Sequence, residues 1–171
     1  MDFIDAKLMC VLTCCEDGIK SNLIAYYMYL FQIAGYDFNF RFKITYNGIR
    51  SRGLDNYIDE LLNLGVITDG NGILHSTKEM MDRLSDEYVV TIAEDEKHNA
   101  ILNKLNSMSF DDIIFLVITA MTIKEVKKKY GINGLSRSNN YVKDTIEKLS
   151  NNYSDENLDK AISIIRVIEG R

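Results

Sequence analysis

The stretch from Asn22 to Ile67 constrains the fold of this 171-residue chain most, because its hydrophobic period changes along its length. Apolar residues within 23–34 recur at steps of three and four, which is typical of a helix with one buried face. After Gly35, aromatic and polar residues alternate from 38 to 46, as in a strand buried on one face. The period therefore predicts a helix followed by a long strand.

A turn, a second helix and a hairpin are predicted next. Asn47-Gly48 ends the strand, and an amphipathic helix from about Ser51 closes on Gly65, a residue suited to a left-handed cap. Asp69-Gly70-Asn71-Gly72 then predicts a hairpin turn, because Asn and Gly tolerate the positive φ of tight turns. Helices followed by a hairpin are the order of a winged helix.

An ordered set of aromatic, aliphatic and glycine residues in this stretch resembles three related groups. They are small bacterial proteins of the YwgA type, the Panacea antitoxin domain, and the middle components of three-part defence systems built around an SMC-like ATPase. Their usual Gly-Pro-Tyr-Ser turn is Gly48-Ile49-Arg50-Ser51 here. The resemblance implies a winged-helix-like module that acts as a binding subunit, with no catalytic residues. The matching residues are Tyr29 to Gln32, Gly35, Tyr36, Phe38, Phe42, Ile44, Tyr46, Gly48, Ser51, Leu54, Leu61 and Gly65 to Ile67.

The sequence of the second half of the chain predicts mostly helices. Ser109 is expected to cap one of them, Thr122-x-x-Glu125 to open the next as a capping box, and further helices to start near Ser136 or Ser138 and near Asp155. Residues 86–93 stay undecided between strand and helix. The expected fold is α+β and mostly α. It has a winged-helix-like domain at 1–84 and a helical C-terminal region at 85–171, with a second candidate helix-turn-helix at 110–150.

Composition points to a cytoplasmic chain without a metal. The N-terminus lacks the basic start of a signal peptide, and the longest apolar run, Ile113 to Met121, is too short to span a bilayer. Cys10, Cys14 and Cys15 are then expected to stay reduced. Cys10 and Cys14, four residues apart, could bind a metal ion together with His75 or His98, but buried free thiols explain the cysteines better.

No pattern predicts catalysis or a cofactor. The two histidines lie outside any catalytic context, and glycine-rich nucleotide-binding motifs are absent from the sequence. Asp111-Asp112 and Asp55/Asp59 fit helix N-terminal charge and a solvated helix face better than they fit an acid pair. We therefore expect a protein that is not an enzyme.

Two segments were considered for nucleic-acid contact. The predicted helix at 51–64 presents acids outward, which is the wrong sign for phosphates, and the net charge of -5 opposes binding at a distance. The segment from Lys124 to Lys143 offers residue types that bond phosphates and base edges. Its candidate contacts are Lys124, Lys127, Lys128, Lys129, Arg137, Asn139, Asn140 and Lys143.

The preferred functional hypothesis is a non-enzymatic protein-binding subunit or adaptor, from an anti-phage defence complex with an SMC-like ATPase or from a toxin–antitoxin system. Its expected partner is that ATPase, an effector or a toxin, with DNA contacted only within a complex and no membrane. The sequence is rich in Tyr and Met, residue types that protein interfaces favour. The alternative is a DNA-binding transcriptional regulator that uses the Lys124 to Lys143 segment.

Overall fold

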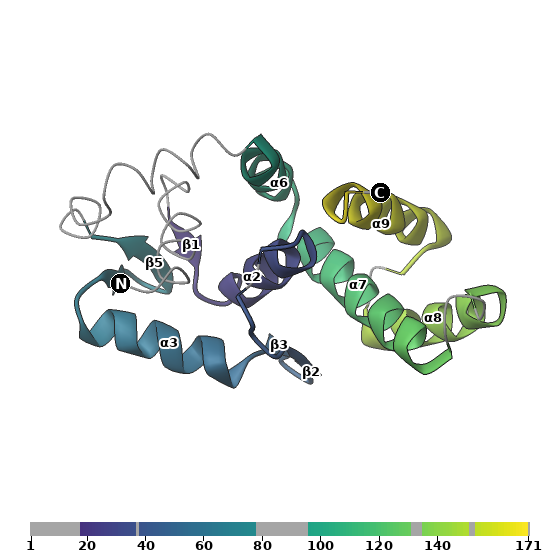
Figure 1. Ribbon diagram of the computed structural model, residues 1–171, viewed down its shortest axis with the longest axis horizontal. Coiled ribbons are helices and arrows are strands. Elements are labelled where there is room, and N and C mark those ends of the chain that lie inside the picture. The colour runs from purple at the N-terminus through teal and green to yellow at the C-terminus, as the bar shows by residue number, and fades with distance from the viewer. Residues whose placement is uncertain (1–17, 37, 78–95, 131–134, 151–152, 171) are drawn as a thin grey trace. The chain divides into compact units, whose positions relative to one another are not determined.

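The computed structural model describes residues 18–36, 38–77, 96–130, 135–150 and 153–170 of the chain. It forms two compact units, Met1–Ser107 and Met108–Arg171, and Figure 1 labels most of their elements. The chain mixes helices and strands and is mostly helical, which confirms the predicted fold class. The predicted boundary between residues 84 and 85, the cysteines and the undecided segment 86–93 all lie outside the described residues.

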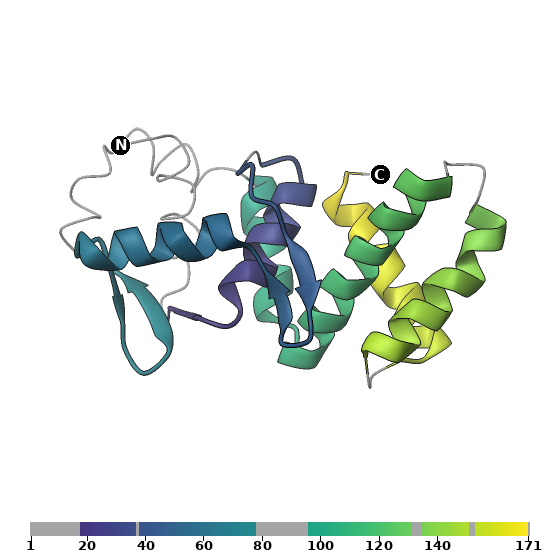
Figure 2. The same ribbon diagram turned by 90° about the horizontal axis from the view of Figure 1, so that it is seen from below.

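The first unit contains two small antiparallel sheets. In the larger sheet β5 lies between β1 and β4, and the smaller one is the hairpin of β2 with β3. Figure 2 shows the β2–β3 hairpin at one end of α3 and the β4–β5 hairpin at the other. The elements are β1 (Ile19–Lys20), α2 (Ile24–Ile33), β2 (Lys43–Thr45), β3 (Gly48–Arg50), α3 (Arg52–Asn63), β4 (Ile67–Asp69), β5 (Ile73–Ser76) and α6 (Glu96–Asn106).

Helix α2 forms the centre of the first unit. Every residue from Ile24 to Phe31 is buried, because this helix is apolar on all sides. The hydroxyl of Tyr27 donates to Asn106 of α6 at 3.1 Å, and Lys97 of α6 donates to the carbonyl of Ala34. Residues distant in the sequence therefore fix the two ends of α2.

The predicted strand over 38–46 is wrong except at Lys43–Thr45. Asn39 has a left-handed φ of 58°, which interrupts the extended backbone. The amide side chain of Gln32 bonds both the N–H and the carbonyl of Phe40, each at 3.1 Å, and so takes the place of a neighbouring strand. The aromatic residues of this segment pack as a cluster instead, and Phe38 stacks on Phe40 with ring centroids 6.3 Å apart.

Both predicted ends of α3 are confirmed. Ser51 is the N-cap, and its hydroxyl accepts a hydrogen bond from the N–H of Leu54 at 3.4 Å. Gly65 has a φ of +67°, and the N–H groups of Gly65 and Val66 donate to Leu62 and Leu61, which is a Schellman motif. The helix therefore starts and stops where its own sequence dictates.

The predicted hairpin at 69–72 is also confirmed. Asn71 and Gly72 have φ values of 58° and 79°, and Gly70 and Ile73 exchange both backbone hydrogen bonds across the turn. The carboxylate of Asp69 accepts from the N–H of Gly72 at 2.7 Å. Strand β1 was not predicted, and it pairs with the outer edge of β5 that this hairpin provides.

The second unit consists, in its described residues, of α7 (Phe110–Tyr130), α8 (Leu135–Leu149) and α9 (Asp155–Ile168). Ser109 and Ser154 cap α7 and α9 by accepting hydrogen bonds from backbone N–H groups. The predicted helix start at Thr122 is wrong, because no Gly or Pro interrupts 110–130 and α7 runs through it. Thr122 is buried within the helix rather than exposed at an end.

Candidate functional site

The predicted nucleic-acid residues lie on two helices of the second unit. Lys124, Lys128 and Lys129 are exposed and Lys127 is half-buried in the last turns of α7, and Asn140 is exposed on α8. Cations are stabilised at a helix C-terminus by the helix dipole, so the positions on α7 have an ordinary structural explanation. Arg137 and Asn139 lie in α8, and their side chains are not among those described.

Lys143, the last predicted contact, has a partner within the chain. Its ammonium donates to the carboxylate of Asp155 at 2.7 Å, and the hydroxyl of Tyr153 donates to the same oxygen at 2.8 Å. The hydrogen bond from Lys143, followed by that from Tyr153, lowers the pKa of Asp155. The bond to Asp155 raises the pKa of Lys143 and of Tyr153. This cluster ties α8 to the start of α9.

The residues weighed as metal or acid sites do not come together where the structure describes them. No group of three or more His, Cys, Asp or Glu among the described residues could hold a metal ion. Asp111 and Asp112 occupy the first turn of α7, and His75 lies half-buried on β5. Nor does any described helix have the length and apolar character needed to cross a bilayer.

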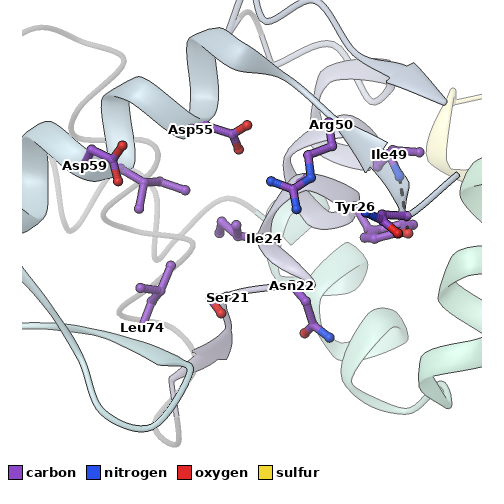
Figure 3. Close-up of a pocket in the computed structure, with 12 residues that line it drawn as sticks. Ser21, Asn22, Ile24, Tyr26, Ile49, Arg50, Asp55, Asp59 and Leu74 are labelled. Carbon is purple, nitrogen blue, oxygen red and sulfur yellow. Dashed lines mark hydrogen bonds between the residues drawn. The ribbon is translucent and has the colours of Figure 1, made fainter. Parts of the chain in front are cut away.

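A hollow of about 420 Å³ opens beside α2 in the first unit. Figure 3 shows Arg50 of β3 and Asp55 of α3 pointing toward one another across it. The two side chains form no ion pair in the part of the chain described. Ile24 and Leu74 give the hollow an apolar side, so its lining is mixed.

A second groove, of about 570 Å³, lies between the β2–β3 hairpin and the first turn of α3. Four cations, Arg41, Lys43, Arg50 and Arg52, line it together with a single acid, Asp55. Sequence reasoning missed this site, because it searched for basic runs and for helix faces. The available signal was four cations and no acid from residue 38 to residue 54.

The tip of the β2–β3 hairpin carries the most exposed large hydrophobic side chain of the described residues, Tyr46, at 98% exposure. The turn that holds it is fixed by its own hydrogen bonds. The hydroxyl of Thr45 donates to the carbonyl of Gly48 at 2.7 Å and accepts from the N–H of Asn47 at 3.3 Å. The hairpin therefore presents an aromatic ring to solvent on a braced support.

Comparison of the chain with models of known protein families, with curated proteins and with solved structures gives no match. The geometry therefore has to carry the functional argument. Two surface features of the first unit stand out, the exposed Tyr46 and the groove with its four cations.

Proposed function

We propose that the protein is a non-enzymatic protein-binding subunit or adaptor, and that the tip of the β2–β3 hairpin contacts its partner. Exposure of Tyr46 carries this proposal, because its large ring protrudes into solvent at the hairpin tip, where a partner would bury it on binding. Tyrosine is among the residues most enriched at the energetic centres of protein interfaces.

The surroundings of Tyr46 suit a contact that changes little on binding. Thr45 and Asn47, the residues before and after Tyr46, form hydrogen bonds within the turn. The N–H of Ile49 donates to the buried hydroxyl of Tyr26 at 3.4 Å. Binding would then cost little ordering entropy. The hollow lined by Asn47, the next residue along, offers a recess beside the protruding ring.

The order of elements in the first unit supports a winged-helix-like module. A short strand, two helices and a hairpin follow one another, and the last strand pairs with both the first strand and its hairpin partner. The β2–β3 hairpin would be an insertion between the two helices. The proposal accordingly keeps the resemblance to the YwgA type, the Panacea domain and the middle components of SMC-ATPase defence systems. It places the protein in the cytoplasm.

The test is to co-express the tagged chain with the products of its neighbouring genes and to measure the mass of the purified species. An SMC-like ATPase, an effector or a toxin should elute with the wild-type chain in a fixed ratio. Tyr46→Ser should abolish that complex. Leu64→Ser is the matched control, because Leu64 is also a large exposed apolar residue, at 67%, but lies at the other end of α3.

Two outcomes would contradict the proposal. A wild-type chain that elutes alone beside every neighbour would remove the adaptor function. Equal loss of the complex in Tyr46→Ser and Leu64→Ser would remove the hairpin tip as the contact.

A DNA-binding regulator remains the second proposal, supported by the exposed Lys124, Lys128 and Lys129 near the end of α7. It ranks lower because Lys143 is engaged by Asp155 and the α7 lysines are explained by the helix dipole. Submicromolar binding of duplex by the isolated chain at physiological salt, lost on changing these lysines, would favour it.

A further inference from the structure

The groove between the β2–β3 hairpin and α3 has a concentration of positive charge that the fold does not require. We propose that it binds the sugar–phosphate backbone of a single-stranded nucleic acid through Arg41, Lys43, Arg50 and Arg52. This site belongs to the first unit, whereas the basic segment of the regulator proposal belongs to the second, and it is additional to the binding of a protein partner.

The two strands of the hairpin place like charges directly opposite one another. Lys43 pairs with Arg50 in the antiparallel register, and the neighbouring pair is the apolar Ile44 with Ile49. The hairpin therefore has one apolar face and one basic face. Like charges at directly opposed positions destabilise a β-ladder, so this pair costs stability unless an anion lies over it.

The start of α3 breaks a second local rule. Arg52 is the first residue of the helix after the Ser51 cap, where the helix dipole disfavours a cation. The same dipole, together with the first-turn N–H groups that have no partner within the helix, favours a bound phosphate; the N–H of Leu54 is already bonded to Ser51. Places where a sequence goes against local preferences at a cost are often functional sites.

A third feature that the fold does not explain is Gly53. It lies in the first turn of α3 and lines the groove, but its φ is not positive. A Cβ there would meet the ring of Phe40 at 3.6 Å, an ordinary contact. Glycine weakens a helix relative to alanine, and one use that repays this is close approach of a ligand to the backbone.

The four cations form no ion pairs within the part of the chain that the structure describes, although the side chain of Arg50 points toward Asp55. Asp55 is the single acid among the residues that line the groove. The chain as a whole carries a net charge of -5, so this is a local concentration and not part of a generally basic surface. A local positive groove attracts polyanions despite an acidic remainder.

Two observations favour single-stranded nucleic acid as the occupant. Guanidinium groups, three of the four cations, match phosphate oxygens with paired hydrogen bonds. The ring of Phe40 lines the groove among these cations, an arrangement used for binding single strands through stacking and charge together. The bases of a duplex are paired and stacked on one another, so a single strand suits such a ring better.

The test is a fluorescence anisotropy titration of the full chain with a labelled oligothymidine of about fifteen nucleotides. We expect micromolar binding at about 50 mM salt, weakening with salt at a logarithmic slope near −0.7 for each phosphate contacted. Lys43→Gln with Arg50→Gln should lose at least about tenfold in affinity and lower the slope by about 1.4. A duplex of the same length should bind more weakly than the single strand.

The matched control is Lys148→Gln with Arg166→Gln. It removes the same two residue types and the same charge from exposed positions on α8 and α9, and it should change affinity less than about twofold. Urea midpoints of both double variants check that each still folds.

Each of the following results would overturn the proposal. They are no binding by the wild-type chain up to about 100 μM, an equal loss in the control variant, competition by poly-glutamate as strong as by unlabelled oligothymidine at equal charge, and equal or tighter binding of duplex. If changing Lys124 and Lys128 abolished binding while changing Lys43 and Arg50 did not, that result would also overturn the proposal and favour the regulator.

Discussion

The hydroxyl of Tyr26 lies against Gly48, so close that a Cβ at that glycine would come within 2.1 Å of it. The same hydroxyl accepts a hydrogen bond from the N–H of Ile49 at 3.4 Å. Tyr26 is buried in α2, whereas its two neighbours, Gly48 and Ile49, belong to the hairpin that carries Tyr46 and lines the basic groove. One side chain of the core therefore positions both candidate binding surfaces.

Gly48→Ala should destabilise the fold by more than about 1 kcal/mol. The φ of Gly48 is +101°, a conformation that L-residues adopt only with strain, and the clash with Tyr26 adds to that cost. The change in the urea midpoint measures it. An unchanged midpoint would mean that the turn relaxes freely around a side chain.

Two further variants separate the causes. Tyr26→Phe in the Gly48→Ala background should recover part of the loss, since it removes the clashing oxygen and leaves the backbone strain. Gly53→Ala should have the opposite sign, with a gain of about 0.5–1 kcal/mol, because Gly53 lies in a helix without a positive φ.

Gly65→Ala should cost about 1 kcal/mol, less than Gly48→Ala. Its φ of +67° is left-handed, but a Cβ there would meet no atom within 4 Å, so only the backbone term applies. Gly65→Asn should cost less than Gly65→Ala, because asparagine tolerates this conformation better. Thermal melts of the two variants give the comparison, and equal losses would contradict the account.

The elements predicted well from the sequence are those specified by short-range chemistry. The start of α3 near Ser51, the Gly65 cap and the Asn71-Gly72 turn each depend on a few neighbouring residues, and each was predicted. The strand at 38–42 failed because an alternating aromatic pattern resembles a strand, whereas Gln32, eight residues before Phe40, takes its backbone bonds. Hydrophobic periodicity carries no information about such a bond between a side chain and the backbone of another segment.

The candidate binding site was harder to predict than the fold. The cations of the groove lie at residues 41–52, on a strand pair and a helix start, so no single helix face or basic run gathers them. Only the register that places Lys43 opposite Arg50 brings them to one side. Lys143, by contrast, was predicted as a nucleic-acid contact but pairs with Asp155. That pairing depends on how α8 meets α9, which the sequence pattern did not reveal.

Thr119→Val should stabilise the protein by about 1 kcal/mol. The hydroxyl of Thr119 is fully buried in α7 and has no hydrogen-bond partner among the described residues, and an unsatisfied buried polar group is costly. Thr145→Val is the control, since Thr145 lies half-buried in α8 and should change stability by less than about 0.5 kcal/mol. A loss of stability in Thr119→Val would show that this hydroxyl has a partner after all.

Asp155→Asn should lower stability slightly at neutral pH and not at all in strong acid. The hydrogen bonds from Lys143 and Tyr153 lower the pKa of Asp155 in the folded state, so the ionised form is the stabilised one. That contribution is complete above the unfolded pKa of about 4 and is lost as the pH falls through the folded value. Carboxyl NMR titration should give Asp155 a lower midpoint in the wild type than in Lys143→Gln. Equal midpoints would count against the pair.

Lys43→Glu should raise stability and weaken nucleic-acid binding in the same protein. The new carboxylate would lie directly opposite Arg50 and turn a like-charge pair into an opposite-charge pair, a gain of about 0.2–1 kcal/mol. The same change removes one phosphate contact and adds a repulsive charge to the groove. A variant that simply damaged the fold would lose both properties together, so urea melts and the oligothymidine titration of one preparation separate the two explanations. If Lys43→Glu lowered the urea midpoint, the like-charge pair would not be a stability cost, and that part of the argument for a bound phosphate would fail.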